Sequence, residues 1–258
     1  MPDRPDFSLD GLVAVVTGGS KGIGKAIAIA FAEAGADVAL AARGEEDLQL
    51  VAKEVESRGR RALAVPTDVS DQAQIQALVA RAVQELGTID VLVNNAGAAP
   101  FFSTIDSIRE SGFEKYFRIN FMSAFFATKA VAPILLEKQS GSVINMASVS
   151  GFIASPGLSY YSTAKAAMIN LTKTTAREWA PSGVRVNAIA PGWIARTSAS
   201  ENAEFVEAMR GAIPLGRWGE PEEVAAAAVF LASPAASFMT GSVIVIDGGM
   251  TLMALTPT

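Results

Sequence analysis

Short apolar runs alternate with longer amphipathic stretches along most of the chain. The runs are nearly continuous, which is typical of strands covered on both faces of a parallel sheet. We therefore predict seven strands, at residues 12–16, 37–41, 61–65, 89–93, 142–146, 184–190 and 242–247. The helices predicted between them are a stretch ending at Glu33, 45–58, 71–86, an irregular-then-helical region at 106–138, and a helix carrying "YYSTAK".

The regular β-α-β alternation indicates a single domain over residues 1–258. Its predicted fold class is α/β, with a doubly wound parallel sheet of about seven strands flanked by helices. One long departure, residues 191–224, follows the sixth strand and is rich in Gly, Pro and Ser. Long excursions at the carboxyl end of a strand often cover a ligand. We therefore expect a substrate loop at about 192–218.

Charge and hydropathy exclude several classes of partner. The net charge is −5 and no run of Lys and Arg occurs, which argues against a nucleic-acid-binding surface. No segment has about 18 uninterrupted apolar residues, so we expect no membrane span. The N-terminal "MPDRPDFSLDG" is polar and acidic and does not resemble a secretory signal. We therefore expect a cytoplasmic protein.

The chain contains no cysteine and no histidine. Their absence excludes disulfides, thiol nucleophiles and the commonest zinc ligands, and no metal site is expected. It also removes the usual general base at neutral pH. Any acid–base chemistry near pH 7 must therefore use a carboxylate, a lysine or a tyrosine with a displaced pKa.

A glycine-rich segment, "VVTGGSKGIGKAIA", joins the first predicted strand to the first helix. Glycines at 18, 22 and 24 would let the backbone turn sharply and approach a pyrophosphate, which a helix N-terminus attracts. The spacing is TGxxxGxG, and its position at the first strand–helix junction strengthens the interpretation. The alternative is a turn whose glycines serve only tight packing.

The end of the second strand favours NADP(H) over NAD(H). Ala42 stands where a carboxylate would bind the ribose 2′-hydroxyl of NAD, and Arg43 follows it. A guanidinium can bind a 2′-phosphate through charge-assisted hydrogen bonds, and Lys21 could add a second positive charge. The alternative is that both cations are ordinary solvated side chains.

The stretch "GLSYYSTAKAAM" carries the candidate catalytic pair. Tyr161 and Lys165 are four residues apart and share a helix face, whereas Tyr160 points about 140° away. A nearby ammonium would lower the pKa of a phenol that otherwise titrates near 10. Ser148 ends the fifth strand, so it should reach the same edge of the sheet and bind a carbonyl oxygen. A Tyr–Lys pair can also occur by chance without a chemical role.

Several motifs in order resemble the short-chain dehydrogenase/reductase family, in particular its 3-oxoacyl-reductase-like branch. They are "TGGSKGIG", "DVS" (68–70), "NNAG" (94–97), "IN" ending at Asn120, Ser148, "YSTAK", "PG" (191–192) and the closing "MTGSVIVIDGGM". The resemblance covers nearly the whole chain. It implies a Rossmann-type sheet, NAD(P)(H)-dependent interconversion of alcohols and carbonyls, and a homo-oligomer, commonly a tetramer.

The resemblance also implies roles for individual residues. Tyr161 would be the general acid/base, Lys165 would lower its pKa and hold the ribose, Ser148 would orient the substrate, and Asn120 would hold a water in a proton relay. The implied cofactor-binding residues are Gly18, Ser20, Lys21, Gly22, Ile23, Gly24, Arg43, Asp68, Val69, Asn95, Ala96, Gly97, Tyr161, Lys165, Pro191, Gly192 and Ile194.

Two of these residues have other interpretations, and one family position differs. Asp68 could instead cap a turn or helix, and Asn120 could fix a backbone kink. The family often has a threonine five residues after the proline of "PG". Here that position is Arg196, and Thr197 comes one residue later, so a contact from Thr197 to the nicotinamide is left open.

The candidate pocket walls are largely apolar, with few charges. They are "AAPFF" (98–102), "GFIAS" (151–155), Trp193 and the helix at 203–210, and they favour a hydrophobic or mid-sized neutral carbonyl compound. Some of these side chains must instead pack the core or subunit contacts.

Two other functions are kept as alternatives. A 3-oxoacyl-(acyl-carrier-protein) reductase would present cations to its acidic partner, but "EKQSGS" (137–142) and "WAPSG" (179–183) offer only Lys138. A non-catalytic NADP-binding sensor or scaffold would be expected to lose Tyr161, Lys165 or Ser148, all of which this chain keeps.

Overall fold

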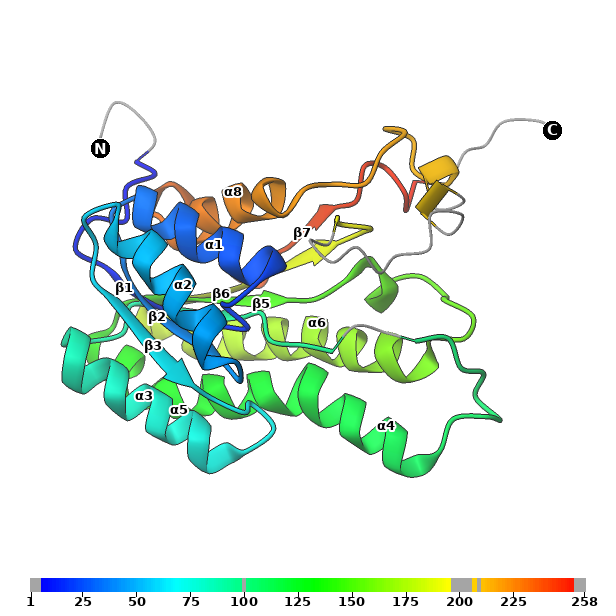
Figure 1. The fold of residues 1–258 in the computed structure, drawn as a ribbon, viewed down its shortest axis with the longest axis horizontal. Helices are drawn as coiled ribbons and strands as arrows, with labels where there is room; N and C mark the ends of the chain where they lie inside the picture. Colours follow the sequence, from blue (N-terminus) through cyan, green and yellow to red (C-terminus); the bar gives the residue numbers. More distant parts are fainter. Residues whose placement is uncertain (1–5, 99–100, 196–205, 208–209, 253–258) are drawn as a thin grey trace.

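The computed structural model describes residues 6–98, 101–195, 206–207 and 210–252. Its centre is a parallel seven-stranded sheet in the order β3-β2-β1-β4-β5-β6-β7 (Figure 1). The strands are β1 (Val13–Thr17), β2 (Asp37–Ala42), β3 (Ala62–Pro66), β4 (Val91–Asn94), β5 (Gly141–Met146), β6 (Val184–Pro191) and β7 (Val243–Ile246). The predicted fold class is confirmed, and the ends of the seven predicted strands are correct to within two residues.

Helices cover both faces of the sheet (Figure 1). One face carries α1 (Gly22–Glu33), α2 (Glu45–Glu56) and α8 (Pro221–Ala232). The other carries α3 (Gln72–Leu86), α5 (Ser123–Lys138) and α6 (Ser159–Trp179). This double covering explains why the strands read as continuous apolar runs: all five residues of β1 are buried.

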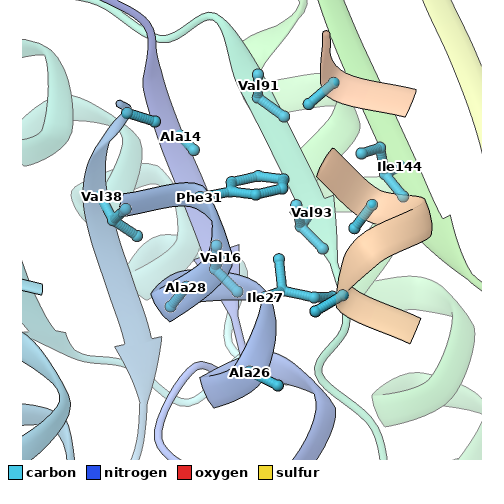
Figure 2. Close-up of a cluster of buried hydrophobic side chains, with 14 of the residues drawn as sticks. Ala14, Val16, Ala26, Ile27, Ala28, Phe31, Val38, Val91, Val93 and Ile144 are labelled. Carbon is cyan, nitrogen blue, oxygen red and sulfur yellow. The ribbon is translucent and has the colours of Figure 1, made fainter. Parts of the chain in front are cut away.

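The core between the sheet and α1 is built around one aromatic ring. Figure 2 shows Phe31 of α1 lying against Ala14, Val91 and Val93 of the central strands. Alanines on α1 let that helix approach the sheet closely. The ring itself has no exposed surface, so this contact ties α1 to the central strands.

The region predicted at 106–138 is a single long helical segment with a local defect. It consists of α4 (Glu110–Phe117), a π-helical turn η1 (Arg118–Met122) and α5. An 18-residue window within the helix Glu110–Lys138 has a mean hydropathy of 1.5, so this helix is long and apolar enough, by length and composition alone, to cross a membrane. The prediction of no candidate membrane span, which was based on the lack of an uninterrupted apolar run, therefore missed this helix. In the fold, Ala127, Val131 and Leu135 of α5 are buried in the core, and 39% of that window is buried, so one side of the segment packs against the sheet.

The strand order reverses between β1 and β4, which places a crevice at the carboxyl edge of the sheet. Ligands bind at such switch points in open α/β sheets. The segments that follow β1, β4, β5 and β6 all emerge at this edge, and they carry most of the predicted site residues.

Candidate active site

A cleft of about 1680 Å³ runs along the carboxyl edge of the sheet. Every residue to which the sequence assigned a catalytic or cofactor-binding role lines this cleft. They come from segments as far apart as the glycine loop and the end of β6, so the fold brings together a set that is dispersed along the chain. Their placement is thus a structural finding, whereas their roles remain predictions.

The glycine loop meets the cleft with its backbone. Gly18 and Gly22 adopt left-handed conformations, with φ of +67° and +54°. A Cβ on Gly24 would lie 2.1 Å from the carbonyl oxygen of Gly18, while one on Gly22 would meet nothing within 4 Å. Gly24 is therefore required for close packing of the loop, as the alternative interpretation held. Gly22, in contrast, leaves open space in front of the helix.

The first amides of α1 are suited to an anion. Lys21 occupies the N-cap of α1 without a side-chain capping bond, so the orphan N–H groups of the first turn have no side-chain acceptor from that position. Gly22, Ile23 and Gly24 all line the cleft. A pyrophosphate fits such a helix start, because the N–H groups and the helix dipole both favour negative charge.

The far end of the cleft is lined by Arg43, Asp68 and Val69. The Asp68 carboxylate accepts hydrogen bonds from the Ser70 backbone at 2.9 Å and from its hydroxyl at 2.7 Å. These bonds, and then the nearby positive charge of Arg43, lower the pKa of Asp68. Asp68 therefore does stabilise a turn, as the alternative interpretation held, while still facing the cleft. Asp71 is the N-cap of α3.

Tyr161, Lys165 and Ser148 meet where α6 crosses the end of β5. Lys165 is buried, and its Nζ donates a hydrogen bond to the Met146 carbonyl at 2.8 Å. That Nζ lies 5.6 Å from the centre of the Tyr161 ring. Ser148 is also buried, and its hydroxyl accepts a hydrogen bond from the Ser150 backbone at 3.2 Å. A hydroxyl, a phenol and an ammonium are thus grouped at one point of the cleft.

The pKa of Tyr161 is shifted in the direction opposite to the one predicted. Burial raises the pKa of Tyr161, and a hydrogen bond with Ser148 opposes the increase. Burial also lowers the pKa of Lys165 from 10.5 to about 8. Attraction between the two charges would favour both ionised forms, but the cost of removing each group from water is the larger effect here.

Asn120 lies in the π-helical turn η1. The backbone is therefore irregular at this residue, as the alternative interpretation of Asn120 held. Its side-chain amide donates to the Tyr116 carbonyl at 3.1 Å. Its buried Oδ1 has no hydrogen-bond partner among the described residues. A Cβ on Gly97 would lie 2.8 Å from that oxygen, so the cofactor wall "NNAG" and Asn120 pack directly together. The unsatisfied oxygen is suited to a water or a ligand donor.

The substrate end of the cleft is mostly apolar in the described part of the chain. Of the predicted wall, Ala98, Phe102, Trp193 and residues 153–155 line the cleft, whereas Phe101, Gly151 and Phe152 do not. Leu158 and Trp218 also line it and were not predicted. The rings of Trp193 and Trp218 lie 5.3 Å apart. A tryptophan at the end of the expected 192–218 loop was a signal that could have been used. The predicted wall at 203–210 lies mostly outside the described residues, as do Arg196 and Thr197.

Curated relatives match almost the full length of the chain. An uncharacterized oxidoreductase of Mycobacterium tuberculosis is 44% identical over 250 residues, covering 95% of this chain and 94% of the relative. The 3-oxoacyl-[acyl-carrier-protein] reductase FabG of Thermotoga maritima is 39% identical over 245 residues, covering 95% and 99%.

Solved structures and a family model agree with these relatives. A short-chain type dehydrogenase/reductase from Mycobacterium marinum superposes with a TM-score of 0.89 at 40% identity, covering 96% of this chain and 98% of that one. A gluconate 5-dehydrogenase from Burkholderia cenocepacia, in complex with NADP and tartrate, gives 0.90 at 33% identity, covering 97% and 99%. A family model described as Enoyl-(Acyl carrier protein) reductase matches residues 18–251. The chain therefore belongs to the short-chain dehydrogenase/reductase family of NAD(P)-dependent oxidoreductases.

Proposed function

We propose that this enzyme transfers a hydride between NADP(H) and an apolar, uncharged carbonyl compound or the corresponding secondary alcohol. One observation carries the proposal. Ser148, Tyr161, Lys165 and Asn120 line the same cleft as the glycine loop and Arg43, and the described wall near them is mostly apolar, with Ser150 and Ser155 among its polar residues. The site therefore combines proton-transfer groups, an anion-binding helix start and a hydrophobic substrate surface.

In the proposed mechanism each side chain has one task. Ser148 donates a hydrogen bond to the carbonyl oxygen and orients it towards Tyr161. Tyr161 gives its proton to that oxygen during reduction and removes it during oxidation. Protonated Lys165 stabilises the Tyr161 phenolate, and the free Oδ1 of Asn120 accepts a hydrogen bond from a water that reprotonates the site. When bound, the cofactor would supply the hydride for reduction and accept it from the carbinol carbon during oxidation.

The preference for NADP(H) rests on the end of β2. Arg43 lines the cleft beside Ala42, and no carboxylate stands at the position that would repel a 2′-phosphate. Lys21 lines the same end of the cleft. The NADP complex of the Burkholderia cenocepacia relative supports the same choice.

The apolar substrate class rests on the wall composition. The described lining near Tyr161 includes Ile153, Leu158, Trp193 and Trp218. The cations of the described lining lie elsewhere: Lys21 and Arg43 at the cofactor loops, and Lys115 and Arg118 on the α4–η1 segment, besides Lys165. A sugar acid would leave its carboxylate without a cation at the substrate end, and burying an unpaired charge is costly.

A 3-oxoacyl-(acyl-carrier-protein) reductase is the second candidate, because the Thermotoga maritima relative carries that name. The cation considered for the acidic partner does not support it. Lys138 forms an ion pair with Asp90 and donates to the Ile89 carbonyl at 3.0 Å. Both residues precede β4, so Lys138 lies at the amino edge of the sheet, opposite the cleft. Lys115 and Arg118 on the α4–η1 segment are the exposed cleft cations outside the cofactor loops that remain for such a partner, among the described residues.

We also propose a cytoplasmic homotetramer. A row of phenylalanines, Phe113, Phe117, Phe121 and Phe125, follows the α4–η1–α5 segment at four-residue spacing, and Phe113 and Phe117 stack at 5.8 Å. The side chains of Phe113 and Phe125 are 37% and 39% exposed. Contact with another copy would remove this apolar surface from water.

Binding and turnover measurements test the proposal. NADPH and NADH are titrated into the purified protein, and oxidation of each is followed with 4-phenyl-2-butanone, acetoacetyl-CoA, acetoacetyl-acyl-carrier protein and 5-ketogluconate. We expect tighter binding of NADPH and preferential turnover of the neutral ketone. Preference for the acyl-carrier thioester would favour the second candidate, and preference for NADH would contradict the role of Arg43.

The Tyr161→Phe variant separates an enzyme from an NADP-binding sensor or scaffold. The variant should bind NADPH like the wild type and lose turnover, because the ring remains and only the proton donor is removed. Full activity in this variant would overturn the mechanism.

A further inference from the structure

Tyr160, the neighbour of the proposed acid/base, has surroundings opposite to those of Tyr161. Its side chain has no exposed surface and is the largest fully buried one in the part of the chain that the structure describes. It does not line the cleft. Its hydroxyl accepts a hydrogen bond from the Phe101 N–H at 2.6 Å and donates one to the Phe101 carbonyl oxygen. One α6 side chain thus satisfies both backbone groups of a loop residue 59 positions away.

Three aromatic rings reinforce this contact. The Tyr160 ring stacks on Phe101 with centroids 5.0 Å apart and an interplanar angle of 27°. Tyr116 of α4 packs edge-on against Tyr160 at 4.9 Å and against Phe101 at 5.1 Å. Such aromatic pairs add stabilisation beyond the apolar area that they bury. The loop after β4, helix α4 and helix α6 are therefore joined at one point.

A second contact holds the same loop on the other side of Phe102. The Ser103 N–H donates to the Gly157 carbonyl at 2.8 Å. Gly157 adopts a φ of +78°, and a Cβ there would lie 3.2 Å from Cδ1 of Phe102. Phe102, which lines the cleft, is thus bracketed by two backbone attachments to the start of α6.

Packing alone does not explain why residue 160 is a tyrosine and not a phenylalanine. A buried phenol is unfavourable unless its oxygen is hydrogen-bonded, and a phenylalanine would fill the same space without that cost. Burial also raises the pKa of Tyr160, so the hydroxyl keeps the proton that it donates. Both hydrogen bonds go to the loop that carries Phe102.

We propose that Tyr160 is a positioning residue for substrate selection: its hydroxyl fixes Phe101 and thereby sets the place of Phe102 at the substrate end of the cleft. This inference rests on the function proposed above. Adjacent tyrosines then divide the work, because Tyr161 transfers the proton while Tyr160 holds the loop that contacts the apolar part of the substrate.

The chain provides its own controls, since its three tyrosines are Tyr116, Tyr160 and Tyr161. Each is changed to Phe, which keeps the ring and removes one hydroxyl. No hydrogen bond joins the Tyr116 hydroxyl to the described part of the chain, so Tyr116→Phe is the matched control. The readouts are NADPH affinity, kcat and KM for 4-phenyl-2-butanone, and amide hydrogen exchange in peptides covering residues 101–103.

We expect Tyr160→Phe to speed exchange in residues 101–103 by about tenfold, because the Phe101 N–H loses its buried acceptor. KM should rise about two- to threefold, no more than the loss expected on removing the Phe102 ring, with kcat within about twofold of the wild type and NADPH affinity unchanged. Tyr116→Phe should match the wild type in every readout. Tyr161→Phe should lose turnover and keep the wild-type exchange rate.

Wild-type exchange and KM in Tyr160→Phe would overturn the inference, as would a loss confined to kcat, which would indicate an effect on Tyr161. If the ketone is not turned over, the exchange rates decide the question alone. Should Tyr160→Phe lose NADPH binding through misfolding, Gly157→Ala tests the same loop by pressing on Phe102. A wild-type KM for 4-phenyl-2-butanone in that variant would overturn the inference, because the Phe102 ring would have been displaced without effect on the substrate. Turnover by Tyr161→Phe would instead contradict the proposed function and leave the exchange result valid.

Discussion

Two loops border the cleft and are held in different ways. The glycine loop at the cofactor end is held by backbone geometry, whereas the loop that carries Phe102 at the substrate end is held by side chains. Gly18 and Gly24 touch one another so closely that no side chain fits between them. The loop around Phe102 depends instead on the Tyr160 hydroxyl and on the aromatic rings beside it. The first arrangement tolerates almost no substitution, and the second can be altered by one functional group at a time.

This difference suggests how one fold accepts many substrates. A cofactor site made of glycine backbone is the same whatever the enzyme reduces. A substrate site made of side chains from separate loops can change shape while the sheet and the glycine loop stay intact. Variants at the two ends should therefore differ in size of effect and in which ligand is affected.

The largest effect is expected from Gly24→Ala. Its Cβ would lie 2.1 Å from the Gly18 carbonyl oxygen and 2.4 Å from the Asn95 amide, so the loop must move. We expect NADPH affinity to fall by about a hundredfold or more, since the helix start would be displaced from the pyrophosphate. Titration of NADPH fluorescence measures this loss.

Gly59→Ala is the matched control for this substitution. Unlike Gly24, Gly59 has a positive φ, of +75°, and a Cβ there would meet nothing within 4 Å. It should lower the free energy of unfolding by about 1 kcal/mol and leave NADPH affinity unchanged. Equal affinities for the two alanine variants would show that the glycine loop is not held by close packing.

These two ends also differ in how much the sequence alone could predict. The glycine loop is a continuous segment between β1 and α1, so its spacing and position carried the prediction. The Tyr160–Phe101 contact joins residues 59 positions apart, and helix geometry could say only that Tyr160 faces away from Lys165. The lowered pKa of Lys165 was also unpredictable, because desolvation depends on how completely the folded chain covers the ammonium.

A second test concerns Lys165, whose ammonium lies between the cofactor end and the substrate end of the cleft. Burial lowers the pKa of Lys165 from 10.5 to about 8. Below pH 8 the folded protein bears the full cost of burying this ammonium. Between pH 8 and 10.5 the unfolded chain keeps a proton that the folded chain has released, so the free energy of unfolding rises with pH. Relative to Lys165→Met, the wild type should gain roughly 2 kcal/mol between pH 7 and 9.5.

Urea unfolding at both pH values measures this gain. Lys173→Met, which removes an exposed lysine from the same helix, serves as the control and should follow the wild type. If Lys165→Met and the wild type had the same pH dependence, the ammonium would not be desolvated in the folded state.

A smaller loss is expected from Arg43→Ala at the cofactor end. Removing a charge-assisted contact to a 2′-phosphate should weaken NADPH binding by about tenfold or more and leave NADH binding unchanged. Arg81→Ala is the control, because Arg81 pairs with Glu85 on the surface of α3. Equal losses for NADPH and NADH would mean that Arg43 contacts a part of the cofactor common to both.

The smallest effect is expected from Phe102→Ala at the substrate end. Phe102 lines the cleft but is 65% exposed, so only part of its ring can be shielded by a substrate. Losing that contact should raise KM for 4-phenyl-2-butanone about threefold and leave NADPH affinity unchanged. Ile105→Ala is the control, because Ile105 belongs to the same loop, is 80% exposed and does not line the cleft. A fall in NADPH affinity in Phe102→Ala would show that the two ends are coupled, and their separation would then have to be abandoned.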